Sequence, residues 1–194
     1  MLQFFSRRLF ALRSACSLYG LRLRLQGWWL GGDKTFLLFI PLVALIVSGF
    51  SLVIVKSAQE RRTHRDLTCL SLNIYHEARG EPRAGQAAVA RVTLNRVASP
   101  RYPDTVCEVV FQKKWDRIRR RYVSAFSWTE LDQSTTKLDR KHWQHAWQVA
   151  DEIYQSHRPG ELDGALFYHA SYIRPSWARK KIRVARIGQH IFYK

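Results

Sequence analysis

The sequence is poor in side-chain patterns that bind metal ions. Of its three cysteines, neither Cys69 nor Cys107 has a second cysteine or a histidine at the short spacing of a zinc site. The histidine pair His142 and His145 has no adjoining cysteine or carboxylate. This scarcity argues against a metal centre, and we expect neither a metal ion nor another cofactor.

Acidic residues are also scarce. The 194 residues include 32 Lys and Arg but only 15 Asp and Glu, which gives a formal net charge of +17 and a pI near 10.4. From residue 56 onward the chain has 26 Lys and Arg against 14 Asp and Glu, a net charge of +12. Such a surplus predicts an anionic partner: nucleic acid, membrane phospholipid or an acidic polymer of the cell envelope.

Charge is absent altogether from residues 36–55. A helix of this length crosses a hydrocarbon core of ~30 Å, so we predict a transmembrane helix here, preceded by a basic cytoplasmic leader over residues 1–35. The six basic residues before the span favour a cytoplasmic N-terminus. Two alternatives remain. One is a cleaved signal peptide, which the long leader and the sequence after Lys56 disfavour; the other is a buried core helix.

Cys69 and Cys107 both follow the predicted span, in the part of the chain that would be exported. They can form a disulfide that closes a loop of 37 intervening residues. The chain-entropy model values such a bond at ~3 to 4 kcal/mol. Two free buried thiols are the alternative.

The rest of the sequence predicts an α+β domain over residues 67–194, after a polar linker over 56–66. Apolar residues at helical spacing, with Gly and Pro at the boundaries, predict helices over 67–78, 84–97, 106–110 and 140–154. Residues 165–170 are strand-like, and residues 177–193 alternate apolar and basic side chains. We therefore expect a mostly helical domain with a small β-sheet packed on the helices.

Glu77 occupies an unusual place in the first of these helices. Leu67, Leu70 and Ile74 recur at helical spacing, and Glu77 continues the same apolar stripe. Burial raises the pKa of a carboxyl group, so that it holds a proton near neutral pH as a general acid must. The alternative is a structural acid at the end of the helix, paired with Arg79.

The domain also contains a series of short segments in a fixed order. They are NIYHEARGEP at 73–82, GQ at 85–86, VTLNRV at 92–97, YPDTV at 102–106, VV at 109–110, FSWT at 126–129, ALFYHA at 165–170, PSWA at 175–178 and IGQHIFY at 187–193. This ordered set resembles the SleB-type cell wall hydrolase family over residues 67–194. By that resemblance the fold is similar to the lysozyme-like lytic transglycosylases.

The resemblance implies a peptidoglycan-cleaving enzyme with Glu77 as the catalytic acid/base at the β-1,4 bond between MurNAc and GlcNAc. It implies a lytic transglycosylase that forms 1,6-anhydro-muramic ends, with a water-using muramidase as the alternative. Hydrolysis would normally need a second carboxylate, for which Glu81, Asp104, Glu130 and Asp132 are available. We expect Glu81 to cap the second helix rather than to contact the substrate.

The candidates for lining the glycan groove are Tyr75, Gln86, Trp128, Tyr168, His169 and Trp177. Aromatic faces stack on the C–H surfaces of sugars, and amides suit N-acetyl groups. Each of these side chains could equally belong to the core, and Gln86 could be a helix-surface amide.

The expected partners are peptidoglycan glycan strands and the lipid of the inner membrane, with the catalytic domain in the periplasm. Because an anchor stands where spore-cortex members carry a separate peptidoglycan-binding module, we expect a general role in envelope remodelling. A non-catalytic, membrane-tethered glycan-binding protein is the alternative from another class. The sequence identifies no protein partner.

The basic run over residues 113–121, with Trp115 inside it, is a pattern also found in nucleic-acid-binding proteins. A solvated protein face is the commoner form of such a run. A nucleic-acid binder would also need the domain on the cytoplasmic side, so we expect no nucleic-acid partner.

Overall fold

The computed structural model describes residues 26–27, 36–117, 119–131 and 137–194. The chain divides into two compact units, Met1–Ser57 and Ala58–Lys194. Nearly all of the predicted leader lies outside the described residues, and so does Asp132.

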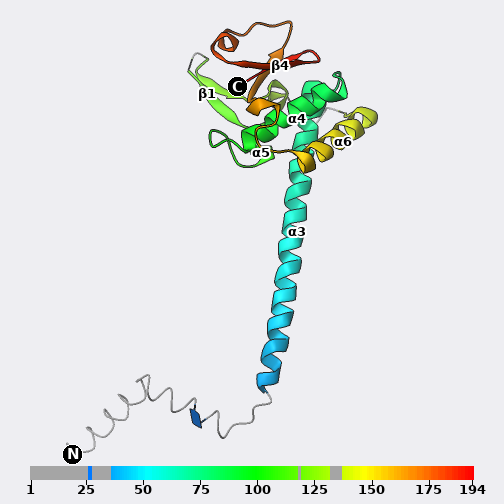
Figure 1. Ribbon diagram of the computed structural model, residues 1–194, viewed down its shortest axis with the longest axis vertical. Coiled ribbons are helices and arrows are strands. Elements are labelled where there is room, and N and C mark those ends of the chain that lie inside the picture. Colours follow the sequence, from blue (N-terminus) through cyan, green and yellow to red (C-terminus); the bar gives the residue numbers. More distant parts are fainter. Residues whose placement is uncertain (1–25, 28–35, 118, 132–136) are drawn as a thin grey trace, which may run out of the picture. The chain divides into compact units, whose positions relative to one another are not determined.

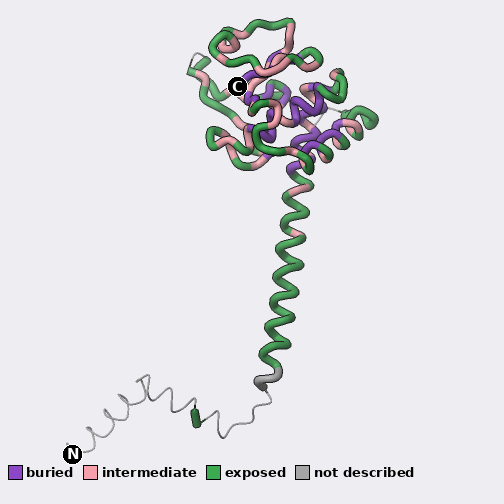
Figure 2. The backbone as a smooth tube through the Cα atoms, in the orientation of Figure 1, coloured by how far each residue is buried: buried purple, intermediate pink, exposed green. Residues whose placement is uncertain are grey.

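Helix α3 extends over Phe36–Ala78 (Figure 1). Among the described residues, it is the one helix long and apolar enough to cross a membrane, judged by length and composition. The large apolar side chains described between residues 39 and 55 are exposed (Figure 2).

Residues 56–66, which we expected to form a polar linker, are helical and belong to α3. Between residues 50 and 79 the sequence has no glycine or proline, and residues 56–66 supply Lys, Ala, Gln, Glu and Arg, which have high helix propensity. Polarity alone had suggested a linker. The helix ends at Ala78, and the Glu81 N–H donates a hydrogen bond of 2.9 Å to the Ala78 carbonyl across the following turn.

Three further helices lie in the second unit: α4 (Arg83–Val97), α5 (Val106–Val110) and α6 (Arg140–Ser156). Each boundary is within two residues of its predicted position. The hydroxyl of Thr105 accepts a hydrogen bond from the Glu108 N–H and so caps α5.

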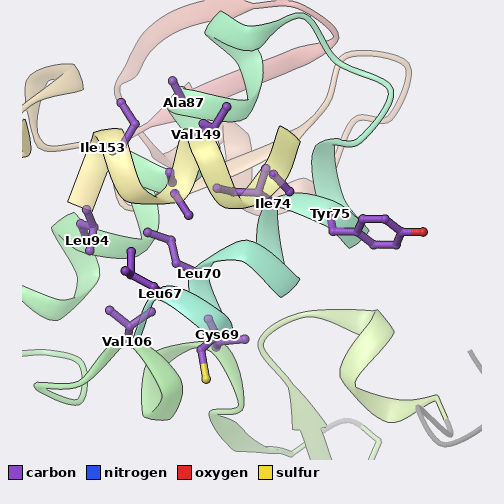
Figure 3. Packing of buried hydrophobic residues seen from close by; sticks show 14 of the residues in the cluster. Leu67, Cys69, Leu70, Ile74, Tyr75, Ala87, Leu94, Val106, Val149 and Ile153 are labelled. Atoms are coloured by element: carbon purple, nitrogen blue, oxygen red, sulfur yellow. The ribbon is translucent and has the colours of Figure 1, made fainter. Parts of the chain in front are cut away.

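The main core forms where the C-terminal part of α3 meets α4 and α6. Leu67, Leu70 and Ile74 of α3 belong to one buried cluster with Leu94 of α4 and Val149 of α6 (Figure 3). These α3 residues are the stripe that the sequence predicts, so its apolar face is the buried one.

Two small antiparallel sheets complete the unit. Strands β3 (Phe167–Ala170), β5 (His190–Tyr193) and β4 (Arg183–Ile187) form a sheet in the order β3-β5-β4. Strands β1 (Lys113–Asp116) and β2 (Arg121–Ser124) form a hairpin. Short 3-10 helices occupy Ser127–Glu130, Leu162–Gly164 and Ser176–Lys180. The predicted class, mostly helical with small sheets, is confirmed.

The three-stranded sheet packs on α4 through a second buried cluster. Phe192 of β5 belongs to one buried cluster with Ala88 and Val92 of α4. The small side chain of Ala88 allows the sheet to approach the helix closely. The packing brings β3 and the β4–β5 turn to the end of α3.

Cys69 and Cys107 are joined by a disulfide. Cys69 lies in the buried cluster of α3, and Cys107 lies in α5. The disulfide therefore links α5 to α3, which carries Glu77 in its last turn and ends at Ala78.

Candidate active site

Glu77 lies in the last turn of α3, one residue before the helix ends. Whereas Leu70 and Ile74 on the same stripe are fully buried, Glu77 is half-buried and lines an open cleft of about 320 Å³. Burial raises the pKa of the Glu77 carboxyl group above its ordinary value of 4.5. The position therefore combines access to a ligand with a preference for the protonated form.

Tyr168 of β3 is the direct partner of this carboxyl group. Its hydroxyl donates a hydrogen bond of 3.1 Å to Glu77 Oε2. This bond and the nearby guanidinium of Arg96 both lower the pKa of Glu77, but burial is the larger effect. Burial, and after it the Glu77 charge, raises the pKa of Tyr168 well above its ordinary value, so the hydroxyl remains a donor.

Arg79 does not pair with Glu77. Its guanidinium lies over the ring of Tyr75, 5.4 Å from the centroid, and one of its nitrogens is 3.5 Å from the Tyr75 hydroxyl. Within the described part of the chain, no ion pair joins Arg79 to Glu77. The alternative of a structural acid paired with Arg79 is therefore not supported.

Glu81 is the second carboxylate that lines the cleft, and its role differs from the prediction. It does not cap α4, which starts after Pro82 without a side-chain cap. Instead, Glu81 Oε2 accepts a hydrogen bond of 2.9 Å from the backbone N–H of Gln189 in the β4–β5 turn. The turn residue Gly188 has a φ of +57°, and a Cβ atom there would collide with Glu81 Oε2.

His190 lies next to the second carboxylate oxygen of Glu81. Its Nδ1 lies 3.8 Å from Glu81 Oε1, and its ring lies 5.3 Å from that of Tyr168. Burial, the largest effect, lowers the pKa of His190 although Glu81 opposes it. His190 is therefore neutral near neutral pH, and its contact with Glu81 is not an ion pair. Glu81 is held mainly by the backbone of the turn.

Arg96 of α4 links the acid to the loop before β3. Its Nε donates a hydrogen bond of 2.9 Å to the Leu166 carbonyl, two residues before Tyr168. Its guanidinium lies over the rings of Tyr102 and Phe126, at 5.5 and 5.3 Å. Arg96 thus stands beside the Glu77–Tyr168 pair and helps to fix the loop that carries Tyr168.

Of the six predicted groove residues, only Tyr168 contacts Glu77. Four others are buried: Tyr75 is 2% exposed, Gln86 4%, Trp128 5% and His169 7%. None of these four lines the cleft that contains Glu77, although His169 lines a separate cavity with Ser171 and Tyr193, so their contact with glycan stays a prediction. Trp177 is half-buried and packs against Phe167, His169 and Tyr193, away from Glu77.

The hydrogen bonds of the buried residues explain their positions. The Tyr75 hydroxyl accepts a bond from the Asp139 N–H, and the Trp128 Nε1 donates to Asn73. Gln86 donates to the Glu81 carbonyl at 3.1 Å, so it fixes the turn that follows Glu77. It is not a helix-surface amide.

His169 is likewise fixed by the fold, through a 2.9 Å contact between its Nε2 and the Tyr193 hydroxyl. In the predicted pair His142 and His145, His142 Nδ1 lies 2.7 Å from Asp139 Oδ1.

The sequence reasoning missed Arg96, His190 and the Gln189 backbone. Arg96 lies inside the VTLNRV segment, but an arginine on a helix is usually solvated, so it gave no signal of its own. His190 and Gln189 lie 113 and 112 positions from Glu77, and only the sheet packing brings them to the same cleft.

The domain is similar to a known protein family and to several of its members. The profile of the cell wall hydrolase family matches residues 80–193. The match begins three residues after Glu77. A spore cortex-lytic enzyme of Bacillus subtilis is 46% identical over 130 residues, which is 67% of this chain and 38% of that protein. A spore cortex-lytic enzyme of Halalkalibacterium halodurans is 30% identical over 128 residues, or 66% of this chain and 34% of that protein. The chain thus spans well under half of the length of these relatives.

A solved structure agrees with the sequence matches. The catalytic domain of the germination-specific lytic transglycosylase SleB from Bacillus anthracis aligns with a TM-score of 0.51 at 30% identity, covering 66% of this chain and 93% of that domain. The profile covers Glu81 and Tyr168, and the relatives and the solved structure each match about two thirds of the chain. The chain belongs to the cell wall hydrolase family.

Proposed function

We propose that this protein is a membrane-anchored lytic transglycosylase that cleaves the β-1,4 bond between MurNAc and GlcNAc in peptidoglycan. The observation that carries the proposal is the Glu77 carboxyl group, which lines an open cleft, is held by Tyr168 and has a raised pKa. The description of the Bacillus anthracis relative as a lytic transglycosylase supports the same reaction class.

In the proposed mechanism, protonated Glu77 donates its proton to the glycosidic oxygen as the C1–O bond breaks and an oxocarbenium-like centre develops. The resulting Glu77 carboxylate then removes the proton of the same sugar's C6 hydroxyl. The C6 oxygen forms a bond to C1 and closes a 1,6-anhydro ring, without consuming water. Tyr168 would stabilise the carboxylate between these steps, because its hydroxyl already points to Oε2.

The surroundings of Glu81 support a single-acid mechanism. Hydrolysis with a second catalytic carboxylate needs an oxygen free to reach water or C1. One Glu81 oxygen accepts the Gln189 N–H, and the side chain is only 10% exposed. Glu130, another candidate, accepts the Ser124 N–H and pairs with Arg121 beside the β1–β2 hairpin. We therefore assign Glu81 a positioning role.

The anchor, its orientation and the domain division belong to the proposal as well. The apolar segment 36–55 would hold the protein in the inner membrane with its N-terminus in the cytoplasm, and residues 67–194 would act in the periplasm. The support is the length and composition of α3 and the disulfide in the domain, since disulfides persist in oxidising compartments. A reporter fused after Lys194 that is active only in the cytoplasm would contradict this orientation.

The test is product analysis. The full chain in detergent is incubated with purified sacculi, and the masses of the released muropeptides are measured by mass spectrometry. We expect anhydro-muropeptides, and we expect the Glu77→Gln variant to release none while keeping its fold. Glu60→Gln, at an exposed position of the same helix, is the matched control. Full activity of Glu77→Gln would remove Glu77 from the mechanism.

The same experiment separates the two alternatives. Products heavier by one water indicate a muramidase, whereas transglycosylation adds no mass. A protein that binds sacculi in a pull-down and leaves them uncut is a non-catalytic glycan-binding protein.

A further inference from the structure

A second cavity, of about 370 Å³, lies next to the β1–β2 hairpin and outside the cleft that contains Glu77. Lys114 and Trp115 of β1 line it together with Arg96 and Tyr102. The ammonium group of Lys114 lies over the Tyr102 ring, 4.5 Å from its centroid, and the Arg96 guanidinium lies 5.5 Å from the same centroid. Two cations and two aromatic rings therefore converge on one cavity.

Within the described part of the chain, the basic side chains at this cavity, Lys114 and Arg96, and the nearby Arg101 form no salt bridge. The one carboxylate in the lining, Asp116, accepts the Arg119 N–H at 3.0 Å and faces the Arg119 side chain at 3.8 Å. Burial, and then the charges of Arg96 and Arg101, lower the pKa of Lys114, as expected for cations held close together.

Arg96 connects this cavity to the candidate acid. It lines the cavity, acts electrostatically on both Glu77 and Tyr168, and donates to the Leu166 carbonyl near Tyr168. A ligand in the cavity would therefore contact a residue that also acts on the candidate acid. A carboxylate suits the site, because Lys114 supplies a charged donor while Tyr102 and Trp115 cover the adjoining carbon atoms.

We propose that the cavity lined by Arg96, Tyr102, Lys114 and Trp115 is a subsite for a carboxylate of the peptide that peptidoglycan strands carry. This inference rests on the proposed function and specifies its substrate: strands that bear peptides bind better than stripped strands. The cations attract the carboxylate, and the rings position the peptide next to the sugar at Glu77.

The test uses soluble peptidoglycan strands that carry peptides and the same strands stripped by an amidase. Initial rates are measured with the full chain in detergent over a range of strand concentrations. For Lys114→Gln we expect KM on peptide-bearing strands to rise about fivefold, with kcat and the KM on stripped strands unchanged. Lys114→Arg should restore most of the wild-type KM, because it keeps the charge.

Lys113→Gln is the matched control, since Lys113 precedes Lys114 on β1, is exposed and lies outside the cavity lining. Thermal unfolding of each variant confirms the fold. The inference is overturned if Lys113→Gln and Lys114→Gln raise KM equally, because general surface charge would then explain the effect. The inference is also overturned if Lys114→Gln weakens the binding of stripped and peptide-bearing strands equally.

A binding measurement separates this inference from the proposed function. Glu77→Gln protein is pulled down with peptide-bearing or stripped sacculi, with and without the added Lys114→Gln change. Weaker binding of the double variant to peptide-bearing sacculi alone supports the subsite, even if the wild type cleaves neither substrate. Lys114-dependent binding to anionic lipid vesicles or to RNA, with no difference on sacculi, would overturn it.

Discussion

Replacing Glu77 by Gln should stabilise the folded protein near neutral pH. Burial raises the pKa of Glu77, so the folded state holds the proton more tightly than the unfolded state. Below the ordinary pKa of 4.5 both states are protonated, and the group costs nothing. As the pH rises through the raised pKa, the folded state must carry a desolvated charge and loses stability. Gln never carries that charge.

The magnitude of the gain follows from the opposing contacts. Each unit of pKa difference corresponds to about 1.4 kcal/mol. The Tyr168 hydroxyl and the Arg96 charge offset part of the burial effect. We therefore expect a net gain smaller than the burial effect alone would give, visible as a higher Tm, and the Gln carbonyl can still accept the Tyr168 hydrogen bond.

The assay is thermal unfolding of the full chain in detergent, from about pH 4 to about pH 8. The gain should be absent at the acidic end and should grow to a plateau above the raised pKa. Glu60→Gln, on the exposed part of the same helix, should show no such dependence. A Glu77→Gln protein that is less stable than the wild type near neutral pH, or a gain that is independent of pH, would refute the reasoning.

Three further predictions concern the surroundings of the acid. Tyr168→Phe removes a hydrogen bond that lowers the pKa of Glu77, so the alkaline limb of the pH–activity profile should move to higher pH. We also expect kcat to fall about tenfold. An alkaline limb that moves to lower pH contradicts the assignment. Gly188→Ala should lower stability by about 1 to 2 kcal/mol more than Gly164→Ala, measured by denaturant unfolding, because both glycines have positive φ but only Gly188 faces Glu81. Reducing the disulfide should cost ~3 to 4 kcal/mol in the same assay, and an unchanged midpoint would show that the cross-link adds no stability.

The helical part of the fold was predictable from the sequence because local signals agreed. Apolar spacing and the Gly80 stop located the end of α3. The helical state of residues 56–66 was not predicted, because the linker prediction used polarity, whereas helix continuity depends on the lack of glycine and proline there. Helix propensity was the stronger signal there.

The candidate site was less predictable because its parts are far apart in sequence. The apolar stripe predicted that Glu77 is partly buried, but its bond to Tyr168 spans 91 positions and depends on how the sheet packs. Aromatic residue type suggested Tyr75 and Trp128 as sugar platforms, yet both are used in the core. Glu81 resembled a helix cap by position, and only the β4–β5 turn reveals its partner, 108 positions away.

The contact between Glu81 and Gln189 has a consequence for biosynthesis. A ribosome makes the α3 end of the cleft more than a hundred residues before it makes the turn that Glu81 binds. During synthesis, a nascent chain therefore carries Glu77 without the residues of the β4–β5 turn that line the cleft. Under the proposed function, cleavage of peptidoglycan would begin only when the β4–β5 hairpin docks.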